Sequence, residues 1–133
     1  MNLTPHHIAL KVVDLKKCER FYTKILRLPV IEHHHEKNGI LRSVWLSLGK
    51  TILMLERCEK KTRSRKAEAR GWHILALKIP VKKRDHWKAK LKKARIKIIN
   101  ESSYSIYFRD PENNLLALSH YPEIGGGSIA LAS

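Results

Sequence analysis

The chain has 133 residues, 43% of them hydrophobic, which predicts one folded domain with its own core. Its 27 lysines and arginines against 12 aspartates and glutamates give a net charge of +15, which either favours acidic partners or is carried on a solvated surface. No apolar run approaches the roughly 20 residues of a membrane span. The first residues do not resemble a signal peptide, and Cys18 and Cys58 make no disulfide framework. We expect a cytoplasmic protein with no membrane partner.

A seven-residue motif occurs twice in the chain. Residues 6–12 read His-His-Ile-Ala-Leu-Lys-Val, and residues 73–79 read His-Ile-Leu-Ala-Leu-Lys-Ile. Such a repeat indicates two similar units that bury their apolar faces together, and a pocket between such units is a natural ligand site. The expected domain contains a first module, a basic connector, a second module and a flexible tail, at about residues 6–57, 58–71, 72–121 and 122–133.

The apolar pattern predicts the same order of elements in each module, which is strand, helix and three further strands. Asp14 is placed to cap the first helix, Pro29 ends that stretch, and Asn38-Gly39 is a strong hairpin signal. The elements expected in the first module lie at residues 6–13, 15–26, 30–36, 43–48 and 51–57. Those expected in the second module lie at residues 72–79, 82–94, 96–100, 104–109 and 115–120.

Several segments of the chain resemble a known family. The first module of the vicinal oxygen chelate superfamily is similar to His7–Val12, Asp14-Leu15, Phe21-Tyr22 and Leu26–Pro29, and a turn of its second module is similar to residues 110–115. The superfamily includes glyoxalase I, fosfomycin and bleomycin resistance proteins and extradiol dioxygenases. The resemblance implies an α+β fold in which two paired βαβββ modules form curled mixed sheets around a cavity. It also implies a homodimer.

The resemblance further implies a divalent metal site with ligands on the first and fourth strands of each module. Neighbouring side chains on a strand point to opposite faces, so His7 points into the cavity and His73 has the wrong parity. Met54 aligns with the family's first carboxylate and Ala117 with its second, while Glu56 lies two residues beyond Met54. The metal candidates are therefore His7 and Glu56, with His73 a weaker one. The expected cofactor is either none or a divalent metal ion.

The same alternation predicts which side chains line the cavity. The expected pocket residues are His7, Lys11, Trp45, Ser47, Met54, Ile74, Ser105, Tyr107, Arg109 and Ser119. Aromatic walls with few polar anchors suit a small anionic or aromatic molecule. Trp45 could instead be a core residue, and Arg109 could pair with Asp110 or Glu112. The consecutive His33, His34 and His35 cannot all face one site, so solvent or the pocket rim is expected for them.

Three functions remain open from the sequence. The first is a small-molecule binding protein of the glyoxalase and bleomycin resistance type without the full metal site. The second is a metal-dependent lyase, isomerase or transferase in which Glu56 is the candidate catalytic residue that moves a proton. The third is a nucleic-acid or anionic-surface module that uses the nine basic residues between Lys82 and Lys97. A basic face without exposed aromatic residues disfavours nucleic acid.

Overall fold

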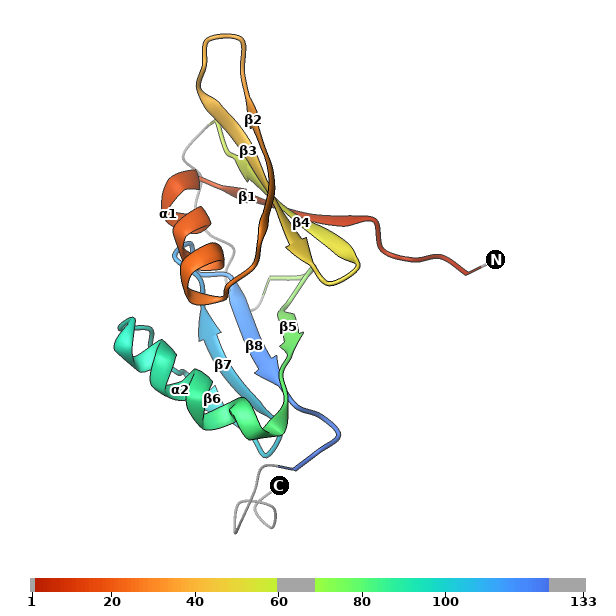
Figure 1. Cartoon of the computed structure of the whole chain (residues 1–133), viewed down its shortest axis with the longest axis vertical. Helices are drawn as coiled ribbons and strands as arrows, with labels where there is room; N and C mark the ends of the chain where they lie inside the picture. The colour runs from red at the N-terminus through yellow and green to blue at the C-terminus, as the bar shows by residue number, and fades with distance from the viewer. Residues whose placement is uncertain (1, 60–68, 125–133) are drawn as a thin grey trace. The chain divides into compact units, whose positions relative to one another are not determined.

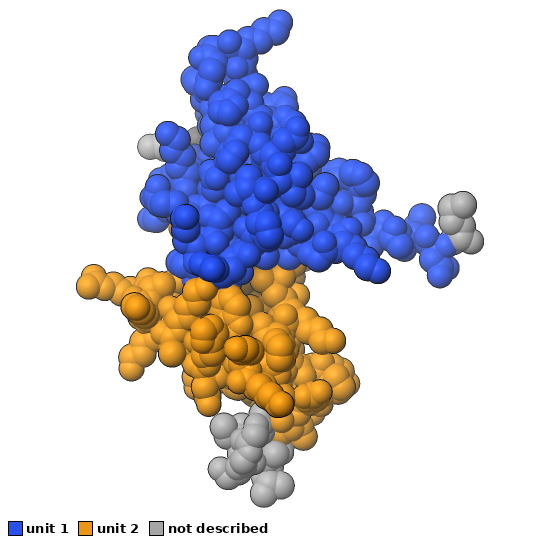
Figure 2. Space-filling model, viewed as in Figure 1, with its two compact units in different colours: residues 1–63 blue, residues 64–133 orange. Residues whose placement is uncertain are grey.

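The computed structural model describes residues 2–59 and 69–124, so most of the expected connector and tail lie outside the described residues (Figure 1). The chain divides into two compact units, residues 1–63 and 64–133 (Figure 2). Each unit contains one four-stranded mixed sheet, which confirms the α+β class and the two modules. No helix among the described residues has the length and apolar character to cross a bilayer.

The first unit follows the expected order of elements. It contains β1 (His7–Val12), α1 (Leu15–Arg20), the π-helical turn η1 (Phe21–Ile25), β2 (Val30–His35), β3 (Leu41–Leu48) and β4 (Thr51–Arg57). The strand order is β1-β4-β3-β2, with β1 parallel to β4 and the other two pairs antiparallel. The two ends of the module, β1 and β4, are therefore neighbours in the sheet.

One continuous helical segment covers one face of this sheet. Asp14 begins it by accepting a hydrogen bond at Oδ1 from the backbone N–H of Lys17 (3.1 Å). The segment buries its apolar stripe, which consists of Leu15, Cys18, Phe21, Tyr22 and Leu26. It packs on β3 and β4. Alternation places Ile8 on the same face of β1 as the buried Val12, but Ile8 is 41% exposed.

The second unit repeats this topology with shorter strands. It contains β5 (Leu75–Lys78), the 3₁₀ turn η2 (Val81–Lys83), α2 (Arg84–Lys93), β6 (Asn100–Glu101), β7 (Ser105–Arg109) and β8 (Leu115–Ser119). The strand order is β5-β8-β7-β6, with β5 parallel to β8. A strand was expected from residue 72, but β5 begins at Leu75, which pairs with Leu116. Continued towards the N-terminus, this parallel register places residues 72 and 73 opposite residues 113 and 114, which precede the start of β8 at Leu115. Residues 72 and 73 therefore have no partner in β8.

The turn between β7 and β8 is held by one side chain. Asp110 Oδ1 accepts hydrogen bonds from the backbone N–H groups of Glu112 and Asn114, both at 2.9 Å. Asp110 Oδ2 accepts a third bond from the side-chain amide of Asn114 (2.8 Å). Asn113 has a φ of +70°, a left-handed conformation that asparagine tolerates better than most residues. These bonds explain why an Asp-Pro-Glu-Asn-Asn sequence forms this turn.

A buried arginine ties α2 to the sheet of the second unit. Arg84 is only 7% exposed, and its guanidinium donates to His120 Nε2 (2.9 Å), Glu101 Oε1 (3.1 Å) and the Ser102 carbonyl (2.9 Å). His120 Nδ1 lies 2.6 Å from the carbonyl oxygen of Glu123. Arginine can only donate and a carbonyl can only accept, so His120 is neutral with its proton on Nδ1. Arg84 is one of the nine basic residues between Lys82 and Lys97, but it is buried and links α2 to the sheet, so it is not available to an anionic surface.

The ion pairs of Glu101 predict an acid-dependent contribution to stability. Lys88 Nζ lies 2.9 Å from Glu101 Oε1. The hydrogen bond from Lys88, and after it the one from Arg84, lowers the pKa of Glu101 below its usual value of 4.5, although desolvation acts in the opposite direction. Because the folded-state pKa is lower, this stabilisation is present above pH 4.5 and is lost as the pH falls through the folded-state pKa. We expect Glu101→Gln to lower the free energy of unfolding by about 1 kcal/mol at neutral pH, since solvent screens the exposed side of the carboxylate.

Urea unfolding at neutral pH and at several acidic pH values measures this difference. The loss in Glu101→Gln should shrink as the pH falls below 4.5. The control is Glu123→Gln, which removes the same charge from an exposed carboxylate that makes no ion pair within residues 2–59 and 69–124. A loss in Glu101→Gln that stays constant with pH would contradict the proposed ion pairing.

Candidate functional site

Side chains of β3 and β4 alternate between a buried face and an open face. Val44, Leu46, Leu53 and Leu55 point towards the helical segment, and each has 0% exposure. Their neighbours Trp45, Met54 and Glu56 therefore share the opposite face and are only half-buried. The register across the strands places Met54 between Ala9 and Trp45, and Glu56 between Lys11 and Ser43.

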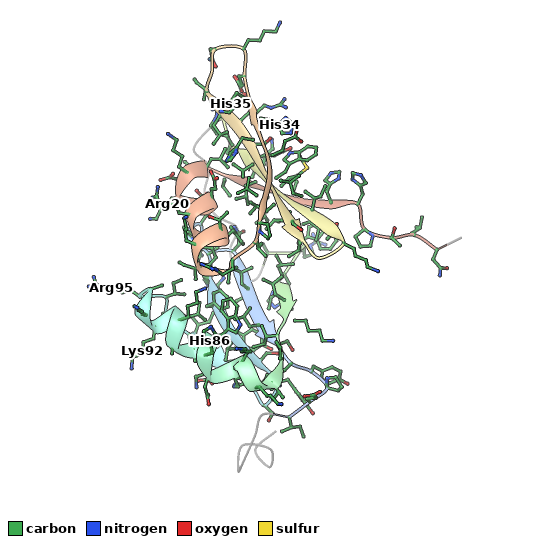
Figure 3. All side chains as sticks on the ribbon, in the orientation of Figure 1. Arg20, His34, His35, His86, Lys92 and Arg95 are labelled. Atoms are coloured by element: carbon green, nitrogen blue, oxygen red, sulfur yellow. The ribbon has the colours of Figure 1, made fainter. Side chains whose placement is uncertain are left out.

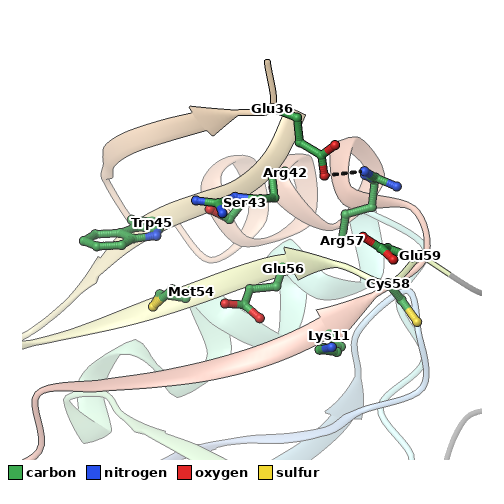
Figure 4. A pocket seen from close by; sticks show the side chains of 10 residues that line it. All are labelled: Lys11, Glu36, Arg42, Ser43, Trp45, Met54, Glu56, Arg57, Cys58 and Glu59. Atoms are coloured by element: carbon green, nitrogen blue, oxygen red, sulfur yellow. Dashed lines mark hydrogen bonds and ion pairs between the residues drawn. The ribbon is translucent and has the colours of Figure 1, made fainter. Parts of the chain in front are cut away.

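This open face contains the candidate site, a pocket of about 480 Å³ within the first unit (Figure 4). Its floor is formed by β1, β4 and β3, and its rim by the residues at the ends of β2 and β4. The residues that line it are Lys11, Glu36, Arg42, Ser43, Trp45, Met54, Glu56, Arg57, Cys58 and Glu59. The pocket thus combines an apolar part with charged groups of both signs.

One ion pair orders the rim of the pocket. Arg57 Nη2 lies 3.0 Å from Glu36 Oε1, and Arg57 Nε donates to the carbonyl of Leu41 (3.3 Å). Across the part of the chain that the structure describes, Lys11, Arg42 and Glu56 take part in no such ion pair. Among the described residues, two cations and one carboxylate of the pocket are therefore outside any ion pair.

The aromatic wall of the site contains an unsatisfied donor. Trp45 contacts the ring of His34, with 4.7 Å between ring centroids and 50° between ring planes. The indole Nε1 of Trp45 is buried and finds no hydrogen-bond acceptor among the described residues. His34 Nε2 is also buried without a well-directed hydrogen bond, although Glu32 Oε2 lies 3.3 Å away. A buried N–H without an acceptor costs about 1–3 kcal/mol, so the position of Trp45 carries an energetic cost that the surrounding packing offsets.

The structure brings four of the expected residues of the first unit to this pocket, namely Lys11, Trp45, Met54 and Glu56. His7 and Ser47 lie on the same strands beyond the pocket, where each pairs with Ile52 in the sheet register. The sequence reasoning missed several lining residues, which are Glu36, Arg42, Ser43, Arg57, Cys58 and Glu59. Ser43 could have been found, because it has the parity of Trp45, whereas residues 57–59 and 36 lie where the strand pattern ends.

The other expected pocket residues belong to the second unit. Ser105 and Tyr107 alternate on β7 with the fully buried Ile106 and Phe108. Ser119 pairs with Ser105 across the antiparallel β7–β8 ladder. Arg109 donates to the carbonyl of Asn113 (3.1 Å) at the end of β7, and Ile74 lies half-buried before β5. These residues thus share the face of the second sheet opposite its buried apolar set.

The donors of the first unit do not fit the divalent metal site that the resemblance implies. His7 pairs with Ile52 and Glu56 with Lys11, so the two residues are four positions apart along the ladder, or about 13 Å. Met54 supplies a thioether between them, and the exposed His73 lies in the second unit. No three His, Cys, Asp or Glu side chains among the described residues gather as metal ligands. Three protein ligands are usual for a catalytic metal.

The comparisons with known proteins identify the family. The sequence model of the Glyoxalase/Bleomycin resistance protein/Dioxygenase superfamily matches residues 4–118. The chain therefore belongs to this superfamily, as the resemblance of its motifs implied. No protein of curated function matches the sequence.

Solved structures show the same fold at low sequence identity. The fosfomycin resistance protein FosX from Listeria monocytogenes is similar with a TM-score of 0.71 and 22% identity, covering 90% of this chain and 93% of that one. A lactoylglutathione lyase from Agrobacterium tumefaciens gives a TM-score of 0.67 and 21% identity, covering 89% of this chain and 93% of that one. A glyoxalase/dioxygenase from Nostoc punctiforme gives a TM-score of 0.72 and 20% identity, covering 90% of this chain and 92% of that one. At such identities these likenesses define the fold.

The alternation on β4 predicts opposite outcomes for two neighbouring residues. Leu53→Ala should lower the free energy of unfolding by about 3 kcal/mol, because it leaves a cavity beneath the helical segment. Met54→Ala should lower it by less than about 1 kcal/mol, because Met54 is half-buried on the open face. Urea unfolding of both variants measures the difference. Equal losses, or a larger loss for Met54→Ala, would contradict the assignment of the two faces.

Proposed function

We propose that this protein binds a small molecule with an aromatic or apolar body and an anionic group, in the pocket of the first unit. One observation carries the proposal: the same pocket contains the ring of Trp45 and two cations, Lys11 and Arg42, that form no ion pair among the described residues. A concave site with apolar walls and a few charged anchors is the usual form of a small-molecule site.

Each group of the pocket has a distinct role in this proposal. The ring of Trp45 and the thioether of Met54 cover the flat or apolar part of the ligand. Arg42 holds a carboxylate, phosphate or phosphonate through two parallel N–H groups, and Lys11 adds a point charge. Glu56 accepts a hydrogen bond from a hydroxyl or amine and so orients the ligand between the two cations.

Fluorescence of Trp45 tests this proposal directly. In a Trp72→Phe/Trp87→Phe background, Trp45 is the remaining tryptophan. Titration with benzoate, salicylate and phenylphosphonate should give a saturable change in its emission, and benzylamine should bind about tenfold or more weakly because it carries the opposite charge. Failure of every anionic compound to alter the emission and to raise the melting temperature would contradict the proposal.

Matched variants separate specific binding from the general charge of the protein. Lys11→Gln and Arg42→Gln should each lower the affinity for phenylphosphonate by about tenfold. Lys50→Gln, in the exposed turn between β3 and β4, removes the same charge outside the pocket and should leave the affinity within about twofold. Equal losses in all three variants would show that only the net charge of the protein attracts the anion.

A second candidate function is a metal-dependent lyase, isomerase or transferase that uses His7, Glu56 and His73. It is favoured by the superfamily, because FosX from Listeria monocytogenes has been solved in complex with Mn(II). The separation of His7 from Glu56 in the first sheet argues against it. Metal analysis after dialysis against Mn²⁺ or Zn²⁺ decides between the two functions. We expect much less than one equivalent of bound metal per chain. One equivalent of metal per chain that is lost in both His7→Ala and Glu56→Gln would establish the metal enzyme.

A further inference from the structure

The second unit contains a groove that shares no residue with the pocket of the first unit. The groove has a volume of about 360 Å³ and lies between α2 and the segment that follows it. The residues that line it are Lys88, Ala89, Lys92, Ile96, Lys97 and Ile98. We refer to these six residues as the α2 groove.

Helical spacing and an unusual helix end together form the α2 groove. Lys88 and Lys92 are four residues apart and so lie on one stripe of α2, with Ala89 beside them. Leu91 faces the other way and is fully buried. After the helix Arg95 has a φ of +61°, and the N–H groups of Arg95 and Ile96 donate to the carbonyls of Lys92 (3.0 Å) and Leu91 (2.9 Å). This Schellman-type turn reverses the chain along the helix.

The reversed segment supplies the apolar surface of the groove. Ile96 and Ile98 are half-buried, and Ala89 is exposed opposite them. The aliphatic stems of the lysines extend this apolar surface, because a lysine keeps its ammonium group in water while its methylenes lie against neighbouring side chains. The groove therefore offers an apolar floor that an aliphatic side chain can enter.

The rim of the groove is positively charged and largely unneutralised. Lys88 already pairs with Glu101 (2.9 Å). Lys92 and Lys97 are exposed, and neither has an acidic partner within residues 2–59 and 69–124. Lys92 and Arg95 project outward from the C-terminal end of α2 (Figure 3). Two unpaired cations thus lie on opposite walls of one apolar groove.

We propose that the α2 groove binds an acidic segment of a partner protein that carries aliphatic side chains. Its aliphatic side chains fill the space against Ile96 and Ile98, and its carboxylates pair with Lys92 and Lys97. Cations on both walls match several carboxylates along a chain better than the single carboxylate of a fatty acid. The net charge of +15 would speed the association with an acidic partner.

Two other acidic partners fit this surface less well. Proteins that bind single-stranded nucleic acid stack bases on exposed aromatic rings. On α2 Trp87 is half-buried, and Lys90 Nζ lies over its ring, 4.9 Å from the centroid. An anionic membrane favours a helix whose apolar face projects outward, whereas the apolar surface here is recessed between lysines. The geometry favours a polypeptide over both.

The test uses the full ¹⁵N-labelled chain and short synthetic peptides made of glutamate and aspartate with two leucines, spaced three or four residues apart. The peptides should shift the amide signals of Ala89, Lys92, Ile96 and Ile98. A peptide with serine in place of both leucines should bind about tenfold more weakly, because it has the same charge and no aliphatic side chain. Binding of the serine peptide with equal affinity would overturn the proposal.

Two charge-reversal variants provide a matched comparison. Lys92→Glu and Lys93→Glu make the same charge change in the last turn of α2, but only Lys92 lines the groove. Lys92→Glu should lower the affinity for the leucine peptides by about tenfold, and Lys93→Glu should lower it by no more than about twofold. Equal effects of both variants, no binding of any leucine peptide, or tighter binding of duplex DNA, decanoate or anionic vesicles at the same signals would each overturn the proposal.

Discussion

The burial of one face of β3 and β4 is the constraint on which the site of the first unit depends. Val44, Leu46, Leu53 and Leu55 must face the helical segment, because exposing these four side chains would forfeit most of the apolar burial of this sheet. Their neighbours then have to face the other way. A slip of one residue would exchange the two sets, so the core that stabilises the fold also determines that Trp45, Met54 and Glu56 line the pocket.

The sequence predicted this part of the site because the alternation is local and strong. Residues 43–48 alternate without interruption, and the opposite faces of neighbouring residues on residues 51–57 and on the first strand extend the pattern, so Trp45, Met54, Glu56 and Lys11 followed from parity. The pattern fails at strand ends. Arg57 and Glu36 are 21 residues apart and meet only through the pairing of β3 with its neighbours. Similarly, the first residue of β5 depends on where its partner strand β8 begins. The pattern of apolar residues in residues 72–79 contains no information about that.

The charges of α2 illustrate the same limit. In the sequence Arg84 is one of nine basic residues and has no feature that separates it from Lys82 or Lys83. In the fold, acceptors 17 and 36 residues away converge on its guanidinium and make its burial tolerable. Arg95 is a second case, because it occupies a left-handed position that glycine would usually take. Neither role leaves a local signal in the sequence.

The net charge of the protein therefore does not describe either of its concave sites. In the pocket of the first unit Lys11 and Arg42 lie with Glu56 and an aromatic ring, so the proposed ligand would be selected by orientation as well as by charge. In the α2 groove the charged lining residues are all lysines and the floor is aliphatic. The positive net charge attracts anions to the protein as a whole and does not by itself distinguish the two sites. Discrimination between the two proposed ligands would have to come from the short-range lining, which is the ring of Trp45 in one site and the side chains of Ile96 and Ile98 in the other.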